Sequence, residues 1–144
     1  MAARRRARRA TAPRRRARKA DARPRVAIGH VVLEVADPRR AAAFYRALGL
    51  RPVVERDGMA ILELRGGTHL LLFRRRGKAK PGPVRAFDFM VEDLDAAHAA
   101  AKRARLPRSA FGEDAAIGHR WFEVTDPDGH VLRVFSSHTQ GRPV

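Results

Sequence analysis

The feature that most constrains the fold of this chain is an internal duplication that begins near residue 26. One design, an extended apolar run, an acidic residue and then a helical pattern, occurs in VAIGHVVLEVADPRRAAAFYRALGL and again in VRAFDFMVEDLDAAHAAAKRARL. Val35 aligns with Val91, and Phe73 aligns with Phe135, so the second copy carries a few extra loop residues. Neither copy alone is large enough to bury a sheet, so we expect the two copies to share one core.

Each copy is predicted to be a β-α-β-β-β unit. Asp37 can cap the first helix, with Pro38 at the first helical position, where its missing N–H costs nothing, and Gly49 can end that helix. Asp93 can cap the second helix in the same way. Apolar runs between turn signals place the remaining strands at about 51–56, 59–65, 68–74, 84–91, 119–125 and 130–136, with a weaker candidate at 106–111.

Alternation along the strands predicts which side chains face a concave groove. In the first strand Val31, Leu33 and Val35 form the natural core face, which turns His30 and Glu34 to the other side. The repeat carries this pattern into the second copy. The side chains expected in the groove are His30, Glu34, His69, Leu71, Phe73, Ala86, Asp88, Met90, Val131, Arg133 and Phe135.

The net charge of +16 is concentrated at one end of the chain. Residues 1–25 hold 12 of the 31 Lys and Arg but one of the 15 acidic residues, with no aromatic residue and no apolar period. This composition predicts a disordered arm. The arm either contacts nucleic-acid phosphates nonspecifically, in a salt-sensitive way, or is a solvated extension without a partner. We therefore expect three parts: the arm, a folded domain at 26–137 made of 26–74 and 84–137, and a C-terminal tail at 138–144.

The composition also limits the redox chemistry and the cellular location. Cysteine is absent, which excludes disulfides and thiolate metal sites. No apolar run approaches the roughly 18 residues of a membrane span. The N-terminus lacks the apolar stretch of a secretory signal. We therefore expect a cytoplasmic protein that makes no membrane contact.

Four segments resemble the vicinal oxygen chelate (VOC) superfamily, which includes glyoxalase I, bleomycin-resistance proteins and extradiol dioxygenases. They are GHVVLEVADPRRAAAFYRALGL, GGTHLLLF, FMVEDLDAA and VTDPDGHVLRVF, and the resemblance extends over about residues 26–137. It implies an α+β fold in which two βαβββ modules form a half-open barrel. In that family the concave face of the barrel holds a metal and the substrate. Members commonly pair their modules across a dimer, so a homodimer is expected here.

The metal site that this resemblance implies is altered in the present sequence. The family takes one ligand from the first strand of each module, typically His, and one from the last, typically Glu. His30 fits the first position, but Ala86 cannot coordinate a metal and Arg133 would repel one. The remaining position holds no donor, although His69 lies two residues earlier on the same face. A divalent ion such as Zn, Ni, Mn or Fe would therefore need His30 together with His69 and Asp88.

We expect the groove to bind a small polar or anionic molecule without a resident metal. A guanidinium can hold a carboxylate or phosphate through two parallel hydrogen bonds, so Arg133 is the expected anchor. Alternatively, Arg133 only neutralises Glu34 or Asp88 across the groove. The residues expected to bind the ligand are His30, Glu34, His69, Asp88, His119 and Arg133.

Two other classes of function stay open. With a rearranged ligand set the chain would be a metal-dependent lyase, isomerase or dioxygenase. If the arm determines function, the chain would associate with nucleic acid. The sequence shows no nucleophile with its base, phosphate loop or dinucleotide motif, so it leaves open whether the chain is an enzyme.

Several other polar and aromatic residues have expected positions outside the groove. His98 is expected on the helix surface, and His130 in the core or at a sheet edge. Tyr45 is expected to pack in the first helix. Either Trp121 or Phe122 faces inward, and alternation does not decide which.

Overall fold

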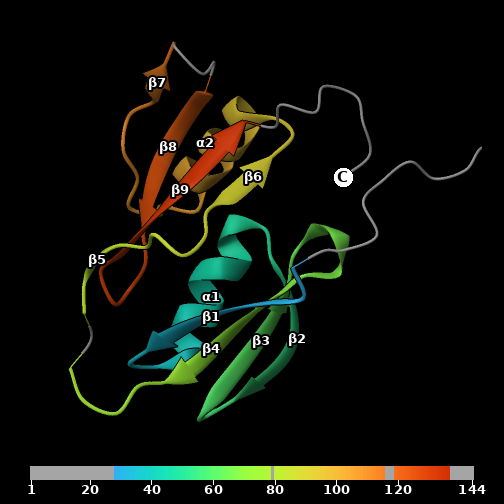
Figure 1. The fold of residues 1–144 in the computed structure, drawn as a ribbon, viewed down its shortest axis with the longest axis vertical. Coiled ribbons are helices and arrows are strands. Elements are labelled where there is room, and N and C mark those ends of the chain that lie inside the picture. Colours follow the sequence, from blue (N-terminus) through green and yellow to red (C-terminus); the bar gives the residue numbers. More distant parts are fainter. Residues whose placement is uncertain (1–27, 79, 116–118, 137–144) are drawn as a thin grey trace, which may run out of the picture.

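The computed structural model describes residues 28–78, 80–115 and 119–136, which form two sheets, two α-helices and one short 3-10 turn (Figure 1). The predicted arm (1–25) and C-terminal tail (138–144) lie outside the described residues. Of the helices in these ranges, none is long and apolar enough to cross a membrane. The elements in chain order are β1 (His30–Val35), α1 (Pro38–Leu48), β2 (Arg51–Arg56), β3 (Met59–Glu63), η1 (Arg65–Gly67), β4 (His69–Arg74), β5 (Gly82–Pro83), β6 (Phe89–Val91), α2 (Leu94–Arg103), β7 (Gly112–Asp114), β8 (His119–Thr125) and β9 (His130–Ser136).

The two sheets have the same topology, which agrees with the duplication seen in the sequence. The first module has the strand order β1-β4-β3-β2, and the second has β6-β9-β8-β7, with β5 also beside β9. In each module the first strand runs parallel to the last, and Glu34 pairs with Phe73 as Met90 pairs with Phe135. The predicted α+β class with two βαβββ modules is therefore confirmed, with one sheet curled into a half-barrel.

Both helices begin at the predicted capping residues. The Asp37 side chain accepts hydrogen bonds from two backbone N–H groups of the first turn of α1, and Pro38 occupies the first helical position. The helix ends at Gly49, whose φ of 114° is in the left-handed region that favours glycine. Asp93 accepts a hydrogen bond from the Ala96 N–H at the start of α2. Local signals therefore fix where each module turns from strand to helix.

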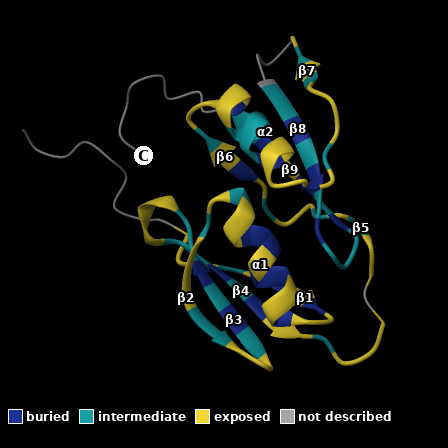
Figure 2. Ribbon diagram, turned by 180° about the vertical axis from the view of Figure 1, so that it is seen from behind, coloured by how far each residue is buried: buried dark blue, intermediate teal, exposed yellow. Residues whose placement is uncertain are grey.

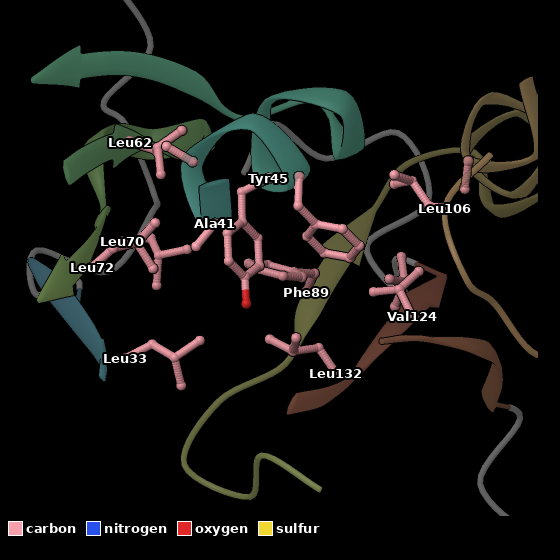
Figure 3. Packing of buried hydrophobic residues seen from close by; sticks show 14 of the residues in the cluster. Leu33, Ala41, Tyr45, Leu62, Leu70, Leu72, Phe89, Leu106, Val124 and Leu132 are labelled. Carbon is pink, nitrogen blue, oxygen red and sulfur yellow. The ribbon is translucent and has the colours of Figure 1, made fainter. Parts of the chain in front are cut away.

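One hydrophobic core joins the two modules (Figures 2 and 3). Tyr45 of α1 is fully buried, and its ring packs edge-on against Phe44 and Phe89 at centroid distances of 5.1 and 6.2 Å. In Figure 3, Tyr45 lies between side chains of the first module, such as Leu70, and side chains of the second, such as Leu132. Burial of this shared apolar surface is the main force that holds the modules together.

A buried polar network adds a second link between the modules. The Asp126 carboxylate, in the turn between β8 and β9, accepts a 2.9 Å hydrogen bond from the Tyr45 hydroxyl and lies 2.9 Å from His130 Nδ1. It also accepts from the backbone N–H groups of Asp128 and His130. Burial, together with the charge of Asp126, raises the pKa of the Tyr45 phenol. Tyr45 and His130 are thus buried structural residues, as the sequence predicted.

The second module departs from the prediction at its first strand. The sequence predicts a strand at 84–91, but only the two ends of this segment bond to β9: the Val84 N–H donates to the Val131 carbonyl, and β6 pairs at the other end. The partners of Pro83 and Phe89 lie only three positions apart on β9, so residues 85–88 leave the ladder and the segment 84–88 forms a bulge. The weaker candidate at 106–111 lies along β8 but forms a single bridge, Arg108 with Val124, and the regular strand β7 begins just after it. Apolar alternation could not reveal the bulge, since it does not count residues on the partner strand.

Candidate functional site

A cavity of about 950 Å³ lies where the second sheet meets the start of the first module. Its volume is within the range of small-molecule sites. The first module contributes residues in and next to β1 and η1, and the second contributes the 84–88 bulge, β6 and side chains of β8 and β9. The charged residues of the lining are Arg65, Arg85, Asp88, Glu92, Glu123 and Arg133.

Arg133 lies on the wall of this cavity with its guanidinium held in place. Glu123 is its cross-strand partner on β8, and Glu123 Oε1 accepts a 3.1 Å hydrogen bond from Arg133 Nε. The guanidinium carbon also lies 5.0 Å from the centre of the Trp121 ring. Within the described residues, no acceptor contacts the two terminal nitrogens of Arg133. The side chain is therefore oriented by protein contacts while two nitrogens suited to a carboxylate keep free donors.

One hypothesis from the sequence is wrong, because Arg133 does not neutralise Glu34 or Asp88 across the groove. Its ion-pair partner is Glu123, and Glu34 instead lies 3.7 Å from Arg75. Side-chain exposures of 52% for Arg133 and 37% for Glu123 mean that this pair contributes little to stability. The main effect of the pair is to fix the direction of the guanidinium.

A glycine makes room for the aromatic ring on which Arg133 lies. Gly112 pairs with Trp121 across β7 and β8, and a Cβ atom on Gly112 would lie 2.6 Å from the indole. The indole can approach the β7 backbone because residue 112 has no side chain. Phe135 extends this aromatic surface, with its ring centroid 6.0 Å from that of Trp121. Phe122 is fully buried in the core, so Trp121 is the residue on the open face.

The 84–88 bulge supplies a further wall of the cavity. Phe87 is partly buried against the core, whereas Arg85 and Asp88 are exposed. Neither of these two charged side chains has an ion-pair or hydrogen-bond partner within the part of the chain that the structure describes. Because the bulge leaves the ladder, Arg133 has no cross-strand partner on this side of β9. The bulge thus opens the sheet edge next to the proposed anchor.

The remaining charged lining residues form an ion pair between the modules. Arg65 of η1 lies 3.0 Å from Glu92, which follows β6. Together with the pair of Arg133 and Glu123, this means that two of the three cations and two of the three anions in the lining are paired within the protein. Arg85 and Asp88 are the two charged groups that are left.

The first sheet carries other predicted site residues, which lie outside the cavity lining. His30 of β1 and His69 of β4 are cross-strand partners whose ring centroids are 5.8 Å apart. Both belong to the alternating set opposite the buried Leu33, and Glu34 lies further along the same face. None of these three side chains lines the cavity, so His30 and Arg133 do not share one hollow as expected. The reason is that each module forms a separate sheet with its own open face.

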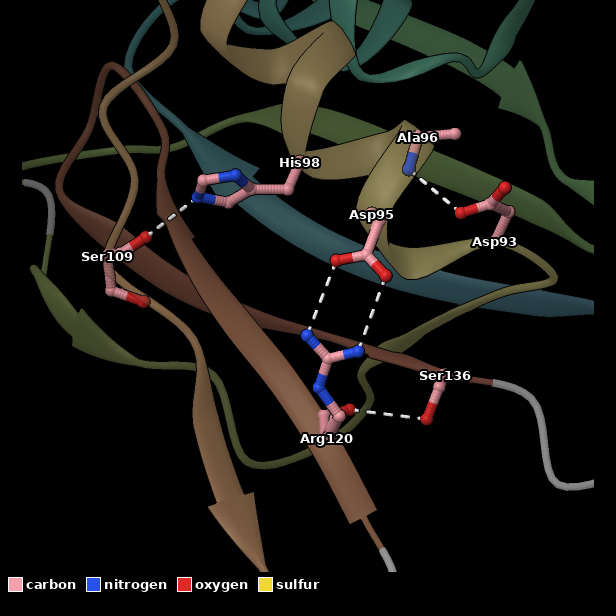
Figure 4. Close-up of polar contacts among 7 residues, drawn as sticks. All are labelled: Asp93, Asp95, Ala96, His98, Ser109, Arg120 and Ser136. Atoms are coloured by element: carbon pink, nitrogen blue, oxygen red, sulfur yellow. Dashed lines mark hydrogen bonds and ion pairs between the residues drawn. The ribbon is translucent and has the colours of Figure 1, made fainter.

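Arg120 of β8 and His98 of α2 lie on the other side of the second sheet, where α2 packs (Figure 4). Arg120 is 3.3 Å from Asp95 of α2, and its guanidinium carbon lies 4.7 Å from the centre of the Phe111 ring. His98 is half-buried at the predicted helix surface, with its ring centroid 4.5 Å from that of Phe111. Neither residue lines the cavity. The side chain of His119 lies outside what the structure describes.

The amino-acid sequence matches one family model over most of its length. The model of the Glyoxalase/Bleomycin resistance protein/Dioxygenase superfamily matches residues 27–134. The chain belongs to this superfamily. It is the VOC superfamily indicated by the sequence motifs. No curated protein sequence matches the chain.

Several solved structures share the fold at low sequence identity. The lactoylglutathione lyase of Agrobacterium tumefaciens is 24% identical with a TM-score of 0.65, and the match covers 82% of this chain and 98% of that one. The bleomycin resistance determinant encoded on transposon Tn5 is 23% identical with a TM-score of 0.64, covering 78% and 99%. A glyoxalase/bleomycin resistance protein from Catenulispora acidiphila is 25% identical with a TM-score of 0.63, covering 77% and 99%. The likeness shows the fold, and the chemistry must come from the site itself.

The residues of this VOC protein do not fit the metal site that the superfamily implies. Within the described residues, no three His, Asp or Glu side chains come together in a group that could hold a metal ion. His30 has His69 beside it, but Asp88 belongs to the bulge of the second module and does not complete the set. The register also places Arg133 at the position equivalent to Leu71, so the second module offers a cation where a donor would be needed. A tight site needs about three well-placed N or O donors, which this arrangement does not provide.

Three residues that shape the cavity are not among those predicted from the sequence: Glu123 and Arg85, which line it, and Gly112, which makes room for Trp121. Glu123 and Arg133 stand on either side of the DPDG turn, but a symmetric count outward from its four residues pairs Glu123 with Leu132. Asp126 and His130 close the turn around three residues, and this extra residue shifts the partner of Glu123 to Arg133. Gly112 is a glycine within a strand, which often marks the close approach of another group. Arg85 carried no such signal, because its position depends on the bulge.

Proposed function

We propose that this VOC protein binds a small polar or anionic molecule in the cavity beside Arg133, without a metal ion in the site. The observation that carries the proposal is the guanidinium of Arg133, which Glu123 and Trp121 orient while no acceptor contacts its terminal nitrogens within the described residues. A guanidinium that is already oriented loses less side-chain entropy when it binds a carboxylate or phosphate.

The apolar part of the lining supports a ligand with an organic body. Aliphatic and aromatic side chains surround the charged groups, and burying the ligand's apolar surface against them would supply affinity that the exposed ion contacts alone do not. The charged anchor would then fix the orientation of the ligand. The apolar lining residues are Ile28, Val31, Leu64, Pro83, Val84, Ala86, Phe87, Phe89, Met90, Val91, Val131 and Phe135.

Arg133→Gln tests the proposal with two matched probes, 3-(2-naphthyl)propanoate and its uncharged amide. Isothermal titration calorimetry of the full chain would measure both dissociation constants. We expect the substitution to weaken binding of the acid about tenfold, since a charge-assisted hydrogen bond contributes roughly 1.5 kcal/mol or more. Binding of the amide should change little.

Arg120→Gln is the matched control. Arg120 also pairs with a carboxylate and lies over an aromatic ring, but it is on the other face of the sheet and outside the cavity. The control should leave the affinity for the acid unchanged. Three results would overturn the proposal. They are an equal loss of affinity for the acid in both variants, an affinity for the acid that does not depend on Arg133, and no binding of the acid up to about 10 mM.

We also propose that the chain forms a homodimer, as the resemblance to the superfamily implies. The open face of the first sheet supports this, because Val32 and Phe73 are 54% and 37% exposed there. Light scattering of the purified chain tests the proposal, and a monomer mass at micromolar concentration would contradict it. The domain limits 26–137 and a cytoplasmic location stay predictions from the sequence.

A further inference from the structure

We infer that the ligand of the cavity is a zwitterion: an apolar body that carries a cationic hydrogen-bond donor as well as an anionic group. This inference rests on the proposed function, since it takes Arg133 as the anchor for the anionic group. The further residue in this inference is Asp88 of the bulge, whose carboxylate would bind the cationic group of the ligand. The corresponding chemical class is an amino carboxylate with an aliphatic or aromatic side chain.

The charges of the cavity lining lead to this class. Two pairs, Arg133 with Glu123 and Arg65 with Glu92, are formed within the protein. Three groups of the lining have no partner among the described residues: the terminal nitrogens of Arg133, one further guanidinium and one carboxylate. The last two are Arg85 and Asp88, and no ion pair joins them although they lie in the same bulge. A ligand that matches this remainder brings at least one anionic group and one cationic group.

A simple anion would leave Asp88 without a partner. Asp88 lines the cavity together with Met90, which is 49% exposed, and an apolar ligand body against Met90 would remove water from the Asp88 carboxylate. Desolvating an unpaired carboxylate is costly, and a second negative charge in the cavity adds repulsion. An ammonium group on the ligand would offset both effects through a charge-assisted hydrogen bond.

The bulge is what brings this carboxylate to the cavity. A regular strand would pair residue by residue with β9, as β1 does with β4. The segment 84–88 has five residues opposite two of β9, so residues 85–88 leave the ladder and form a wall of their own. The first module has no equivalent feature, so the zwitterion site would belong to the second module alone.

Three probes that share one body test the inference: 3-(2-naphthyl)propanoate, 3-(2-naphthyl)alanine and 2-(2-naphthyl)ethylamine. In the full chain, the amino acid should bind roughly threefold to tenfold more tightly than the propanoate, as expected for one partly exposed charged contact. Asp88→Asn should abolish this advantage, while the propanoate should bind as well as before or better. The amine alone should bind more weakly than the amino acid.

Asp57→Asn is the matched control, because Asp57 is an exposed carboxylate in the first module that does not line the cavity. It removes the same charge and should preserve the advantage of the amino acid. The inference is overturned if the amino acid binds no more tightly than the propanoate, or if its advantage survives Asp88→Asn. If the propanoate still binds through Arg133 in that case, the proposed function stands and only the zwitterion is refuted. If neither probe depends on Arg133, both proposals are refuted.

Discussion

The two modules have the same topology and the same register, yet their open faces differ in chemistry. The face of the first sheet carries His30 and His69 side by side, with exposed apolar residues beyond them and no part in the cavity lining. The face of the second sheet carries Arg133, fixed by Glu123 over Trp121, and forms much of the cavity. The same backbone arrangement thus presents an imidazole pair in one module and a guanidinium site in the other.

This difference shows that duplication fixes the scaffold and leaves the function to local departures. The register makes Arg133 the equivalent of Leu71, so one residue decides whether the centre of the face is apolar or cationic. The second departure is the 84–88 bulge, which has no counterpart in β1. Both departures lie in the second module, and both act on the same cavity.

The largest expected effect is a loss of stability when the buried hydrogen bond between the modules, from Tyr45 to Asp126, is removed. Tyr45→Phe removes the hydroxyl that hydrogen-bonds to the buried carboxylate, so the free energy of unfolding should fall by about 1.5–3 kcal/mol. Urea denaturation followed by circular dichroism measures this change. Ser136→Ala is the control, because its hydroxyl makes a long contact of 3.5 Å to a backbone carbonyl and its loss should cost less than about 0.5 kcal/mol.

The same variant tests the pH dependence of stability. Burial raises the pKa of the Tyr45 phenol in the folded state, so the folded chain keeps this proton above pH 10 and the unfolded chain loses it. The contribution to stability is therefore complete below about pH 10 and decreases above it by about 1.4 kcal/mol per pH unit. The difference between the wild type and Tyr45→Phe should shrink accordingly. Since Tyr45 is the sole tyrosine, tyrosinate absorbance should appear only with unfolding, and its appearance in the folded chain would contradict the prediction.

The elements common to both modules could be predicted from the sequence because their signals are local. Asp37 and Asp93 cap helices that begin where expected, and the buried Leu33 and Val35 follow the alternation of β1. The alignment of the two copies is also confirmed, since Glu34 with Phe73 and Met90 with Phe135 are equivalent pairs. Each of these inferences depends on residues that are neighbours in the chain or equivalent in the repeat.

The parts that differ between the modules could not be predicted, because they depend on contacts distant in sequence. Apolar alternation through Phe87 and Phe89 suits a regular strand, and the bulge follows only from the positions of their partners on β9. The same limit explains why His30 was placed in the groove with Arg133. Alternation gives the face of a strand, but it does not tell which faces of two separate sheets meet.

A smaller loss of stability and of ligand affinity should follow when a side chain is added at Gly112, where the second module makes room for the Trp121 ring. In Gly112→Ala the new Cβ would lie 2.6 Å from the Trp121 indole, which has to shift away from Arg133. We expect a loss of about 1–2 kcal/mol in stability and about threefold weaker binding of 3-(2-naphthyl)propanoate. Gly29→Ala is the control in the first module, since nothing lies within 4 Å of its added Cβ. Equal effects of the two substitutions on binding would remove the distinction between the modules.

The smallest effect is expected on the open face of the first sheet, where His30→Ala should leave the affinity for 3-(2-naphthyl)propanoate within about twofold. His30 does not line the cavity, and its nearest ring neighbour is His69 on the same face, so a single chain gives it no route to the ligand. Calorimetry at protein concentrations above and below the dimerisation range sharpens the test. A loss greater than tenfold that appears only in the dimer would mean that a second copy brings its first sheet to this cavity. The contrast between the two faces would then hold within one chain but not within the assembly.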